Sequence, residues 1–522
     1  MISSEKQIIP SGHSQIFLSA THCNPVRLRP YQQQIVDKIA HAAKVSRQVL
    51  ATLPTGGGKT TVMAELVRRM LTRDKRVWCI VHRIELVEQI VARLAKFGIK
   101  AGIIAAGVEP DHDCMVQVCM IQTLVRRSGE ILAELLPDYL MVDECHHATA
   151  GQYQAVFRAC PRAVVVGVTA TAERGDRKGL GDSFTALVQV ISTLELIEQG
   201  YLLRPKYYIG ASDLEGLSDR GSEFNEEEVF ARAERKPQLY AQVVDNYRKY
   251  ARGLPGIVFN VNIAHSLKTA EAFCAAGCRA IHVDGDTPPA ERKRILVDFA
   301  AGKYDILCNV ALFTEGFDLP DIGCVILNRP TKSRPLYHQM VGRAARPTAG
   351  FDCETAEERL AAIAASPCPR FVVIDHGLNV GRFGFWEQPI TYTLDAPKQS
   401  KRGTGKLDTT PIKTCPKCGL YAATQARVCE ECSYTYPSVV DRAVNGDFVE
   451  AEYGKPGKKP KPEPIKKIDL WPAHLRQHYH TPAKLTDAEL EQVQRAAGYK
   501  RTWIYAQQMR RAQFKKGGYA VR

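Results

Sequence analysis

The sequence lacks any long apolar run. Across its 522 residues, no stretch approaches the roughly 18 consecutive apolar residues of a membrane-spanning helix. Residues 1–10 include Glu5 and Lys6 and lack the apolar segment of a secretory signal. These absences predict a cytoplasmic protein. The length predicts about three domains on a prior of roughly 150 residues each.

Acidic residues are scarce in the last quarter of the chain. Residues 396–522 hold 24 of the 70 Lys and Arg but only 12 of the 56 Asp and Glu, so +12 of the net charge of +14 lies there. A basic terminal region beside a near-neutral body favours a polyanionic partner, most simply nucleic acid. Charge alone leaves a solubilising tail open as the alternative.

A glycine run closed by Lys-Thr stands in residues 51–61, ATLPTGGGKTT. Val49 to Leu53 predicts a buried strand before it, and a helix is expected after it. Glycines let backbone N–H groups point into such a turn at the positive end of a helix, which suits phosphate oxygens. Lys59 would then reach the outer phosphates and Thr60 would hold magnesium. Leu53 stands where the strict pattern has glycine, so on these residues alone an ordinary strand-to-helix turn stays open.

Short apolar runs alternate with helical stretches along the chain. We expect strands at 76–81, 115–120, 139–142 and 163–168, then at 256–259, 280–283, 305–310, 324–327 and 371–374. Helical segments between such runs predict parallel sheets covered on both faces, and therefore an α/β fold with two similar domains in tandem. Only the first domain carries a phosphate loop.

An acid pair, Asp143 and Glu144, directly follows an apolar run. Two adjacent acids at the carboxyl end of a buried strand are costly unless they meet a cation. We therefore expect Asp143 to bind magnesium through water and Glu144 to orient and deprotonate an attacking water. An exposed acidic turn is the alternative. The hydroxyls of Thr169 and Thr171, after the next run, could link hydrolysis to domain movement.

Further candidates lie on expected helices. Arg343 and Arg346 are three residues apart and would project from one helix face, with Gln339 one turn earlier. Guanidinium groups there would suit the charge of a transferring phosphoryl group, although an arginine pair is also common on a solvated face. Gln32, in a helix opened by Pro30, could pair with adenine or simply be solvated.

Taken together, these segments resemble the motifs of superfamily-two helicases of the DEAD/DEAH-box type. The matching stretches occur in the family's order between residues 28 and 346: LRPYQ, LPTGGGKT, VHRIELVEQ, MIQT, DECHH, TAT, TEGFD and QMVGRAAR. The resemblance implies two RecA-like domains that hydrolyse ATP in the cleft between them and move along or remodel DNA or RNA.

The resemblance also implies site residues. The ATP-binding set would be Arg29, Gln32, Thr55, Gly56, Gly57, Gly58, Lys59, Thr60, Thr61, Gly316 and Asp318. The catalytic set would be Lys59, Asp143, Glu144, Gln339, Arg343 and Arg346, with Thr60 and Asp143 as magnesium ligands. Nucleic acid would be contacted by His82, Arg83, Gln122, Thr123 and Thr314, mainly at its backbone, so binding should be salt-sensitive and weakly sequence-specific.

A narrower resemblance lies in the second half. DGDTPPAER at 284–292, Asn309-Val310-Ala311, IDHG at 374–377 and a downstream cysteine cluster are similar to the RadD-like bacterial helicases of DNA repair and recombination. The stretch between the last strand and the cysteines is shorter here than that resemblance leads us to expect.

Sixteen cysteines without a secretory signal argue against a disulfide framework. Cys415, Cys418, Cys429 and Cys432 form two CxxC pairs separated by ten residues. Two such pairs supply four thiolates to one tetrahedral zinc, whereas a redox CxxC explains only one pair. We expect a structural zinc ribbon, whose partner, nucleic acid or protein, the sequence leaves open.

The expected organisation is an N-terminal extension at 1–26, RecA-like domains at 27–205 and 206–395, a zinc ribbon at 410–440, a basic linker at 441–480 and a helical segment at 481–522. Lys- and Pro-rich residues 454–467 cannot form a core. A capping-box spacing at Thr486 predicts a helix that ends near Gly498. The final basic and aromatic residues suit single-stranded nucleic acid or docking onto the body.

These features predict an ATP-dependent DNA helicase or translocase, with ATP, Mg²⁺ and Zn²⁺ as cofactors and single-stranded or forked DNA as partner. A repair or recombination protein is a further expected partner. An RNA helicase and a restriction-type duplex translocase remain open within the enzymes. An ATP-switched clamp that recruits a repair protein without unwinding is the alternative from another class.

Overall fold

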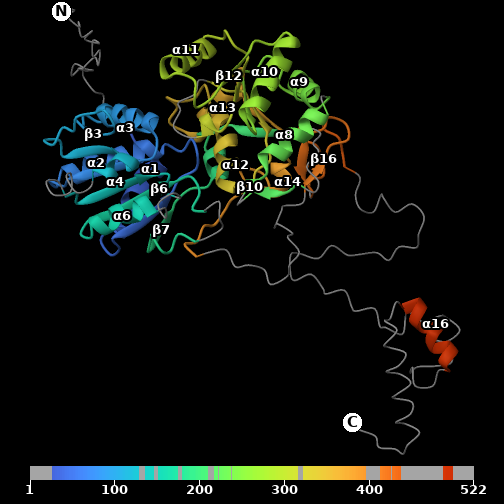
Figure 1. Cartoon of the computed structure of the whole chain (residues 1–522), viewed down its shortest axis with the longest axis horizontal. Coiled ribbons are helices and arrows are strands. Elements are labelled where there is room, and N and C mark those ends of the chain that lie inside the picture. Colours follow the sequence, from blue (N-terminus) through green and yellow to red (C-terminus); the bar gives the residue numbers. More distant parts are fainter. Residues whose placement is uncertain are drawn as a thin grey trace, which may run out of the picture. The chain divides into compact units, whose positions relative to one another are not determined.

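The computed structural model describes residues 26–127, 136–145, 151–173, 179–209, 217–220, 223–236, 238–314, 321–395, 412–424, 426–436 and 486–497 (Figure 1). The chain forms two compact units, Met1–Ser438 and Val439–Arg522. The larger unit contains both main sheets, and α16 (Asp487–Ala497) belongs to the smaller one. Among the helices in these ranges, none has the length and apolar character that crossing a bilayer requires.

The first sheet has seven parallel strands in the order β3-β4-β2-β5-β6-β1-β7. In that order they are β3 (Gly102–Ile104), β4 (Val116–Met120), β2 (Val77–Val81), β5 (Tyr139–Asp143), β6 (Val164–Thr169), β1 (Gln48–Thr52) and β7 (Ala186–Gln189). Its helices are α1 (Pro30–Ala42), α2 (Lys59–Leu71), α3 (Ile84–Lys96), α4 (Ile121–Arg126), α6 (Gly151–Ala159) and α7 (Thr193–Glu198).

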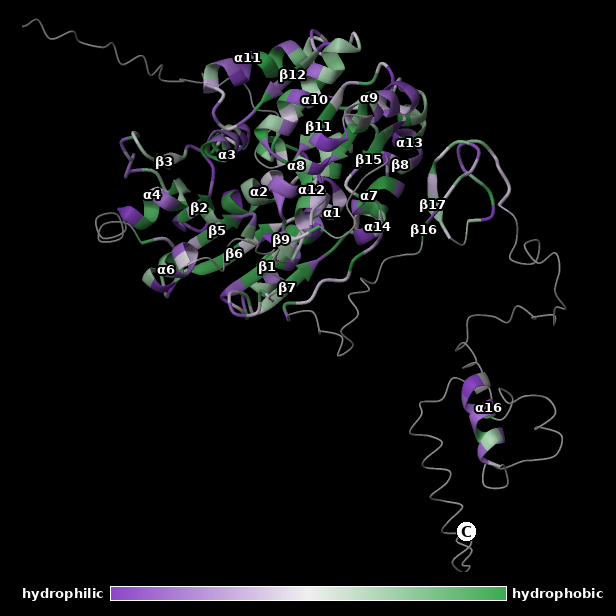
Figure 2. Cartoon of the chain, turned by 45° about the vertical axis from the view of Figure 1, so that its right-hand side comes forward, coloured by the Kyte–Doolittle hydropathy of each residue, from purple (hydrophilic) through white to green (hydrophobic). Residues whose placement is uncertain are grey.

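The two faces of this sheet bury different cores, because successive side chains of a strand point in opposite directions. Val77, Cys79 and Val81 pack with the apolar sides of α1, α2 and α3. Trp78 and Ile80 pack with α4 and α6 on the other face. The continuous apolar runs of the sequence are therefore explained by burial on both sides. Figure 2 shows strands of both sheets coloured mainly as hydrophobic.

The second sheet has six parallel strands in the order β12-β13-β11-β14-β15-β8. They are β12 (Ala280–Val283), β13 (Ile306–Asn309), β11 (Gly256–Asn260), β14 (Cys324–Asn328), β15 (Arg370–Asp375) and β8 (Arg204–Ile209). Its helices are α8 (Glu226–Arg235), α9 (Gln238–Tyr250), α10 (Ile263–Ala275), α11 (Pro289–Ala300), α12 (Arg334–Val341), α13 (Ala356–Ala364) and α14 (Asn379–Phe383). Short 3₁₀ turns lie at Leu312–Thr314 and Gly342–Ala344, and β9 (Asp219–Arg220) pairs with β10 (Glu223–Phe224).

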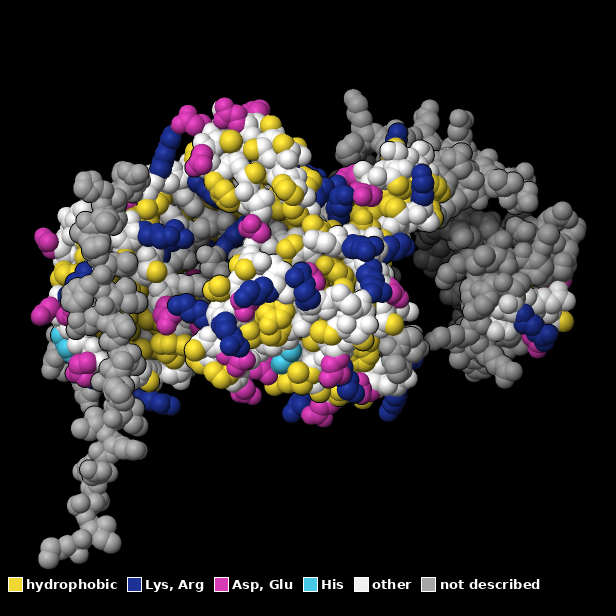
Figure 3. All heavy atoms as spheres, turned by 90° about the horizontal axis from the view of Figure 1, so that it is seen from above, with side chains coloured by type: hydrophobic (Ala, Val, Ile, Leu, Met, Phe, Trp, Pro, Cys, Tyr) yellow, Lys and Arg dark blue, Asp and Glu magenta, His cyan; other side chains and the backbone are white. Residues whose placement is uncertain are grey.

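The architecture is therefore two parallel-sheet domains in tandem, as the alternating sequence pattern predicts, and it agrees with the two RecA-like domains that the resemblance implies. A small antiparallel pair, β16 (Ile412–Thr414) and β17 (Tyr421–Ala423), follows them. A bridge between Tyr208 and Leu420 joins this pair to the edge strand β8. On the face drawn in Figure 3, Lys and Arg side chains lie among acidic and apolar ones.

One predicted helix is wrong in its extent. Arg343 and Arg346 do not share a face of one helix, because α12 ends at Val341 and the chain tightens into a 3₁₀ turn at Gly342–Ala344. Arg346 lies in the irregular segment beyond it. Only Arg343 lies within the 3₁₀ turn, so no single regular helix contains both arginines and their spacing of three does not fix a common face.

The terminal helix agrees with its prediction. α16 ends at Ala497, and Thr486 and Glu489 form the expected capping box. Gly316, Asp318, the linker at 441–480, the basic and aromatic residues after 497 and nearly all of the extension at 1–26 lie outside the described residues.

Candidate active site between the two sheets

The glycine run forms the turn between β1 and α2. Gly56 and Gly58 have φ of +84° and +85°, a left-handed conformation that glycine adopts without steric cost. Gly58 directly precedes Lys59, the first residue of α2, so the turn opens at the positive end of that helix. Leu53, the departure from the strict pattern, is fully buried. A Cβ built on Gly57 would lie 2.9 Å from its Cγ, so Leu53 packs directly beneath the turn.

Residues of α1 hold this turn in place. The hydroxyl of Tyr31 donates to the Gly57 carbonyl oxygen at 2.9 Å, and Nε2 of Gln32 donates to the same oxygen at 3.1 Å. Oε1 of Gln32 accepts from the Arg29 amide N–H at 3.0 Å. Both ends of the buried Gln32 amide therefore contact protein, while the predicted pairing with adenine stays a prediction.

The acid pair ends strand β5 as predicted. Asp143 is 5% exposed and Glu144 6% exposed, and Glu144 has a left-handed φ of +47°. Nζ of Lys59 lies 2.5 Å from Oε1 of Glu144, which supplies the cation that a buried carboxylate needs. Thr169 donates from Oγ1 to Oε2 of Glu144 at 3.4 Å and to the Thr171 carbonyl at 3.0 Å. Thr169 thus contacts the acid pair, and Thr171 contacts Thr169 through its backbone.

The second domain contributes to the same cavity. A cavity of about 500 Å³ is lined by Lys59, Thr60, Asp143 and Glu144 of the first domain and by Arg343 and Arg346 of the second. Arg29, Gln32, Thr55, Gly56, Gly58 and Thr61 also line it. Gln339 is buried and is not among the lining residues. The cavity joins hydrogen-bond donors, an acid pair and several cations, the groups that a triphosphate with a bound divalent cation needs.

The two domains approach each other closely beside the glycine turn. A Cβ built on Gly342 would lie 2.6 Å from Cγ2 and 2.7 Å from Cβ of Thr55. Only glycine therefore allows the arginine-bearing segment to approach the turn this closely. The sequence motif contained Gly342, but nothing in its spacing assigned it this contact.

The residues expected to contact nucleic acid come from both domains: His82 and Arg83 follow β2, Gln122 and Thr123 lie in α4, and Thr314 ends a 3₁₀ turn. Nε2 of Gln122 donates to the His82 carbonyl at 3.2 Å, and Nη1 of Arg83 donates to the Leu312 carbonyl at 3.3 Å across the domain boundary. Thr123 and Thr314 are buried in this arrangement. Arg343, which lines the cavity, donates to the Thr314 carbonyl and so connects this group of residues to the cavity.

An ion pair that the sequence did not reveal also crosses the boundary. Nη1 of Arg292, on α11, lies 2.7 Å from Oε1 of Glu85, on α3. Arg292 also donates to the carbonyls of Gly285 and Thr287. It lies in the stretch quoted for the narrower resemblance, but its partner is 207 residues away, so no local pattern could identify the pair.

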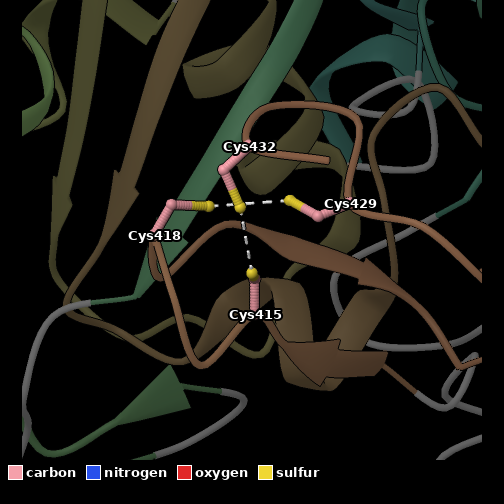
Figure 4. A group of neighbouring side chains, drawn as sticks. All are labelled: Cys415, Cys418, Cys429 and Cys432. Atoms are coloured by element: carbon pink, nitrogen blue, oxygen red, sulfur yellow. Dashed lines mark hydrogen bonds between the residues drawn. The ribbon is translucent and has the colours of Figure 1, made fainter. Parts of the chain in front are cut away.

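The four clustered cysteines converge beside the antiparallel pair of β16 and β17 (Figure 4). Their Sγ atoms all lie within 4.8 Å of one another, with 3.6 Å between Cys415 and Cys432 and between Cys418 and Cys429. Tetrahedral zinc with bonds of about 2.3 Å places its sulfur ligands about 3.8 Å apart. This arrangement could hold one metal ion. The separate cysteines Cys79, Cys119, Cys308 and Cys324 are buried, and burial raises the pKa of each thiol.

Two sequence families match the chain. Residues 25–174 match the family described as type III restriction enzyme, res subunit, and residues 239–348 match the helicase conserved C-terminal domain. A 51.5 kDa protein of a Lactococcus phage is 27% identical over 386 residues, covering 73% of this chain and 77% of the phage protein. The Saccharomyces cerevisiae protein named "Putative ATP-dependent helicase IRC3" is 29% identical over 341 residues, covering 61% of this chain and 49% of the yeast protein.

A solved structure shares the fold. The structure named as a fragment of "a putative HsdR subunit of a type I restriction enzyme" from Vibrio vulnificus aligns with a TM-score of 0.51 at 19% identity. The alignment covers 66% of this chain and 63% of that one. The chain thus spans about half of the yeast relative and under two thirds of the restriction fragment.

Proposed function

We propose, because this chain belongs to the DEAD/DEAH-box superfamily of helicases, superfamily two, that it hydrolyses ATP between its two RecA-like domains and thereby moves along or unwinds DNA. The observation that carries the proposal is the shared cavity. Lys59 and Glu144 from the first sheet and Arg346 from the second domain line it together. Such a site gains its full set of cations only when both domains contribute.

The ion pair between Lys59 and Glu144 describes the site before nucleotide binds. A carboxylate held by an ammonium group at 2.5 Å is a poor base, because the cation stabilises its charged form. A bound triphosphate would compete for Lys59 through its outer phosphates. Glu144 would then be released to orient a water and accept its proton as that water attacks the γ-phosphorus, while the bond to the β,γ-bridging oxygen breaks and ADP leaves. Nucleotide binding itself therefore activates the base.

The remaining groups would stabilise the transferring phosphoryl group. Arg343 and Arg346 would face the charge that develops on its oxygens, as arginine fingers do. Thr60 and Asp143 would hold magnesium, which neutralises phosphate charge when bound. The left-handed Gly56 and Gly58 place the turn for backbone contact with the phosphates.

The cysteine cluster would hold zinc. Four sulfur ligands within 4.8 Å of one another suit a closed structural site and leave no position for substrate. We assign zinc the role of folding the small segment that contains β16, β17 and the four cysteines. This segment contacts β8, where Lys206 and Glu431 form an ion pair of 2.5 Å.

DNA is the substrate we favour over RNA, because the first domain matches a family described as a restriction-enzyme subunit. The same match supports a duplex translocase as the second candidate. A role in repair or recombination, with a protein partner, rests on the resemblance of residues 284–292 and 374–377 to RadD-like helicases. An ATP-switched clamp would use the same site without separating strands.

Strand separation and movement can be assayed independently. The proposal predicts that ATP drives release of a labelled strand from a fork or displacement of streptavidin from biotinylated DNA. A translocase would displace streptavidin from duplex DNA without opening forks. Stimulated hydrolysis with intact forks and undisplaced streptavidin would support the clamp, and stimulation by RNA alone would exclude the DNA assignment.

A further inference from the structure

The two domains are joined by residues 199–203, between α7 and the edge strand β8 of the second sheet. α7 ends at Glu198, and Gly200, two residues later, has a φ of +69° that turns the chain away from the helix. The Tyr201 amide then donates to the Leu196 carbonyl at 2.8 Å. The linker is thus a turn with a defined backbone hydrogen bond, and its side chains contact both domains.

The ring of Tyr201 lies between side chains of both domains. Cζ of Arg29, which lines the nucleotide cavity, is 4.6 Å from the ring centroid. Cζ of Arg359, on α13 of the second domain, is 4.1 Å from it. Tyr201 is only 8% exposed, and cation–π attraction grows as the partners are removed from water. One aromatic ring therefore joins two cations that come from different domains.

Arg359 is itself held firmly. Its Nε donates to the Gln199 carbonyl at 2.8 Å, and its Nη1 donates to the carbonyls of Cys353 and Glu354 at 3.2 and 3.0 Å. A Cβ built on Gly200 would lie 2.8 Å from Cβ of Arg359. The guanidinium group is consequently fixed against the linker and moves with the second domain.

On the other side, Tyr201 reaches the phosphate turn. Its ring meets the Tyr31 ring edge-on, with 5.2 Å between centroids and 64° between planes. The Tyr31 hydroxyl accepts from Nη1 of Arg29 at 3.1 Å and donates to the Gly57 carbonyl at 2.9 Å. Tyr201 therefore contacts Tyr31, which in turn contacts the turn that would hold the phosphates.

The next two linker residues touch both halves of the site. A Cβ built on Gly56 would lie 2.7 Å from Cδ2 of Leu202, so Leu202 packs on the phosphate turn. The Leu203 amide donates to the Ala345 carbonyl at 2.8 Å, one residue before Arg346. A shift of the linker would therefore move the turn and the arginine segment relative to each other.

We propose that Tyr201 is a positioning residue that couples nucleotide bound at Arg29 to the closure of the Arg343–Arg346 segment over the phosphates. Nucleotide that engages Arg29 fixes one cation on the ring, and the ring in turn fixes Arg359 and the second domain. This inference rests on the proposed ATP hydrolysis at the same cavity, and it adds a coupling residue that does not itself touch nucleotide.

A mutant cycle on the full chain tests the coupling. The variants are Arg29→Met, Arg359→Met and the double variant, each made with Tyr201 and with Tyr201→Leu, and Tyr201→Phe is the matched control that keeps the ring. The readouts are kcat and KM for ATP with saturating single-stranded DNA. Loss of two partly buried cation–π contacts predicts that Tyr201→Leu lowers kcat/KM roughly tenfold, while Tyr201→Phe changes it less than about threefold.

The cycle separates coupling from packing. With Tyr201 present, the effects of the two arginine variants should deviate from a simple product by at least about threefold, because both act through the ring. In the Tyr201→Leu background, the fold-change of the double arginine variant should equal the product of the fold-changes of the two single arginine variants. Multiplicative effects with Tyr201 present would overturn the inference, as would equal losses in the Leu and Phe variants. If Tyr201→Leu does not fold, the cycle with Tyr201 present still decides.

Failure of the inference and failure of the proposed function give different results. Failure of the wild-type protein to hydrolyse ATP with any nucleic acid would contradict the function itself. Wild-type hydrolysis that depends on Lys59, combined with multiplicative arginine effects, would contradict only the role of Tyr201.

Discussion

Replacing Gly342 by alanine should separate catalysis from nucleotide binding. The added Cβ would lie 2.6 and 2.7 Å from two carbons of Thr55, whereas carbon atoms pack at about 3.5–4.0 Å. One of these carbons is the Thr55 Cβ, which no side-chain rotation can move away. The arginine segment must therefore withdraw from the phosphate turn by about 1 Å.

A misplacement of about 1 Å in a catalytic group can lower the rate about 100-fold. We expect Gly342→Ala to lower kcat by about this factor with little change in the affinity for a fluorescent ATP analogue, since most groups of the phosphate site belong to the first domain. The assay is DNA-stimulated ATP hydrolysis at saturating ATP. Gly381→Ala is the matched control, because Gly381 has no positive φ and a Cβ built there has open space around it.

Wild-type kcat for Gly342→Ala would refute the close approach of the two segments during catalysis. A loss of the same size in Gly381→Ala would show that the effect comes from destabilisation of the second domain. A melting temperature measured for both variants distinguishes that case.

Three further outcomes are expected. Lys59→Ala should weaken ATP binding in a fluorescence titration and reduce turnover at least 100-fold, because it removes the phosphate-facing cation; appreciable residual activity would contradict the assignment. Cys418→Ser should lower the zinc content measured by mass spectrometry from one per chain and lower the melting temperature, since metal binding contributes to folding; unchanged zinc would contradict a four-cysteine site. Burial lowers the pKa of His338 to about 3, so between pH 6.5 and that value the unfolded chain binds a proton that the folded chain does not. As the pH falls from 7 to 5, this histidine should therefore lower the free energy of unfolding by about 2 kcal/mol. Urea titrations of His338→Gln should show a free energy of unfolding that depends less on pH than that of the wild type. Identical pH dependences in the two proteins would contradict this expectation.

The sequence was most informative where structure follows local pattern. The strand Ala280–Val283 is predicted to the residue, because a short apolar run between turn residues has few other solutions. The turn at Gly56 to Gly58 and the acid pair are likewise local, since each stands at the end of a buried strand. The cysteine spacing predicted a convergence that the structure contains.

What the sequence missed depends on distant contacts. α12 ends just before Gly342, and Gly342 lies close against Thr55; neither feature has a signature in residue spacing. The pairing of Lys59 with Glu144 arises only when β1 and β5 are placed in one sheet. Tyr201 follows an ordinary helix end, and its arginine partners lie 172 residues before and 158 residues after it. Such contacts are set by the packing of domains, which periodicity does not encode.

The most direct test of the central claim is ATP hydrolysis by the wild-type chain and by Glu144→Gln, measured with single-stranded, forked and duplex DNA and with RNA. Glutamine keeps the size of the side chain and cannot accept the proton of the attacking water. We expect DNA to stimulate the wild-type rate, and we expect Glu144→Gln to bind ATP and DNA while hydrolysing almost nothing. Hydrolysis near the wild-type rate in Glu144→Gln, or a wild-type rate that no nucleic acid changes, would contradict the account.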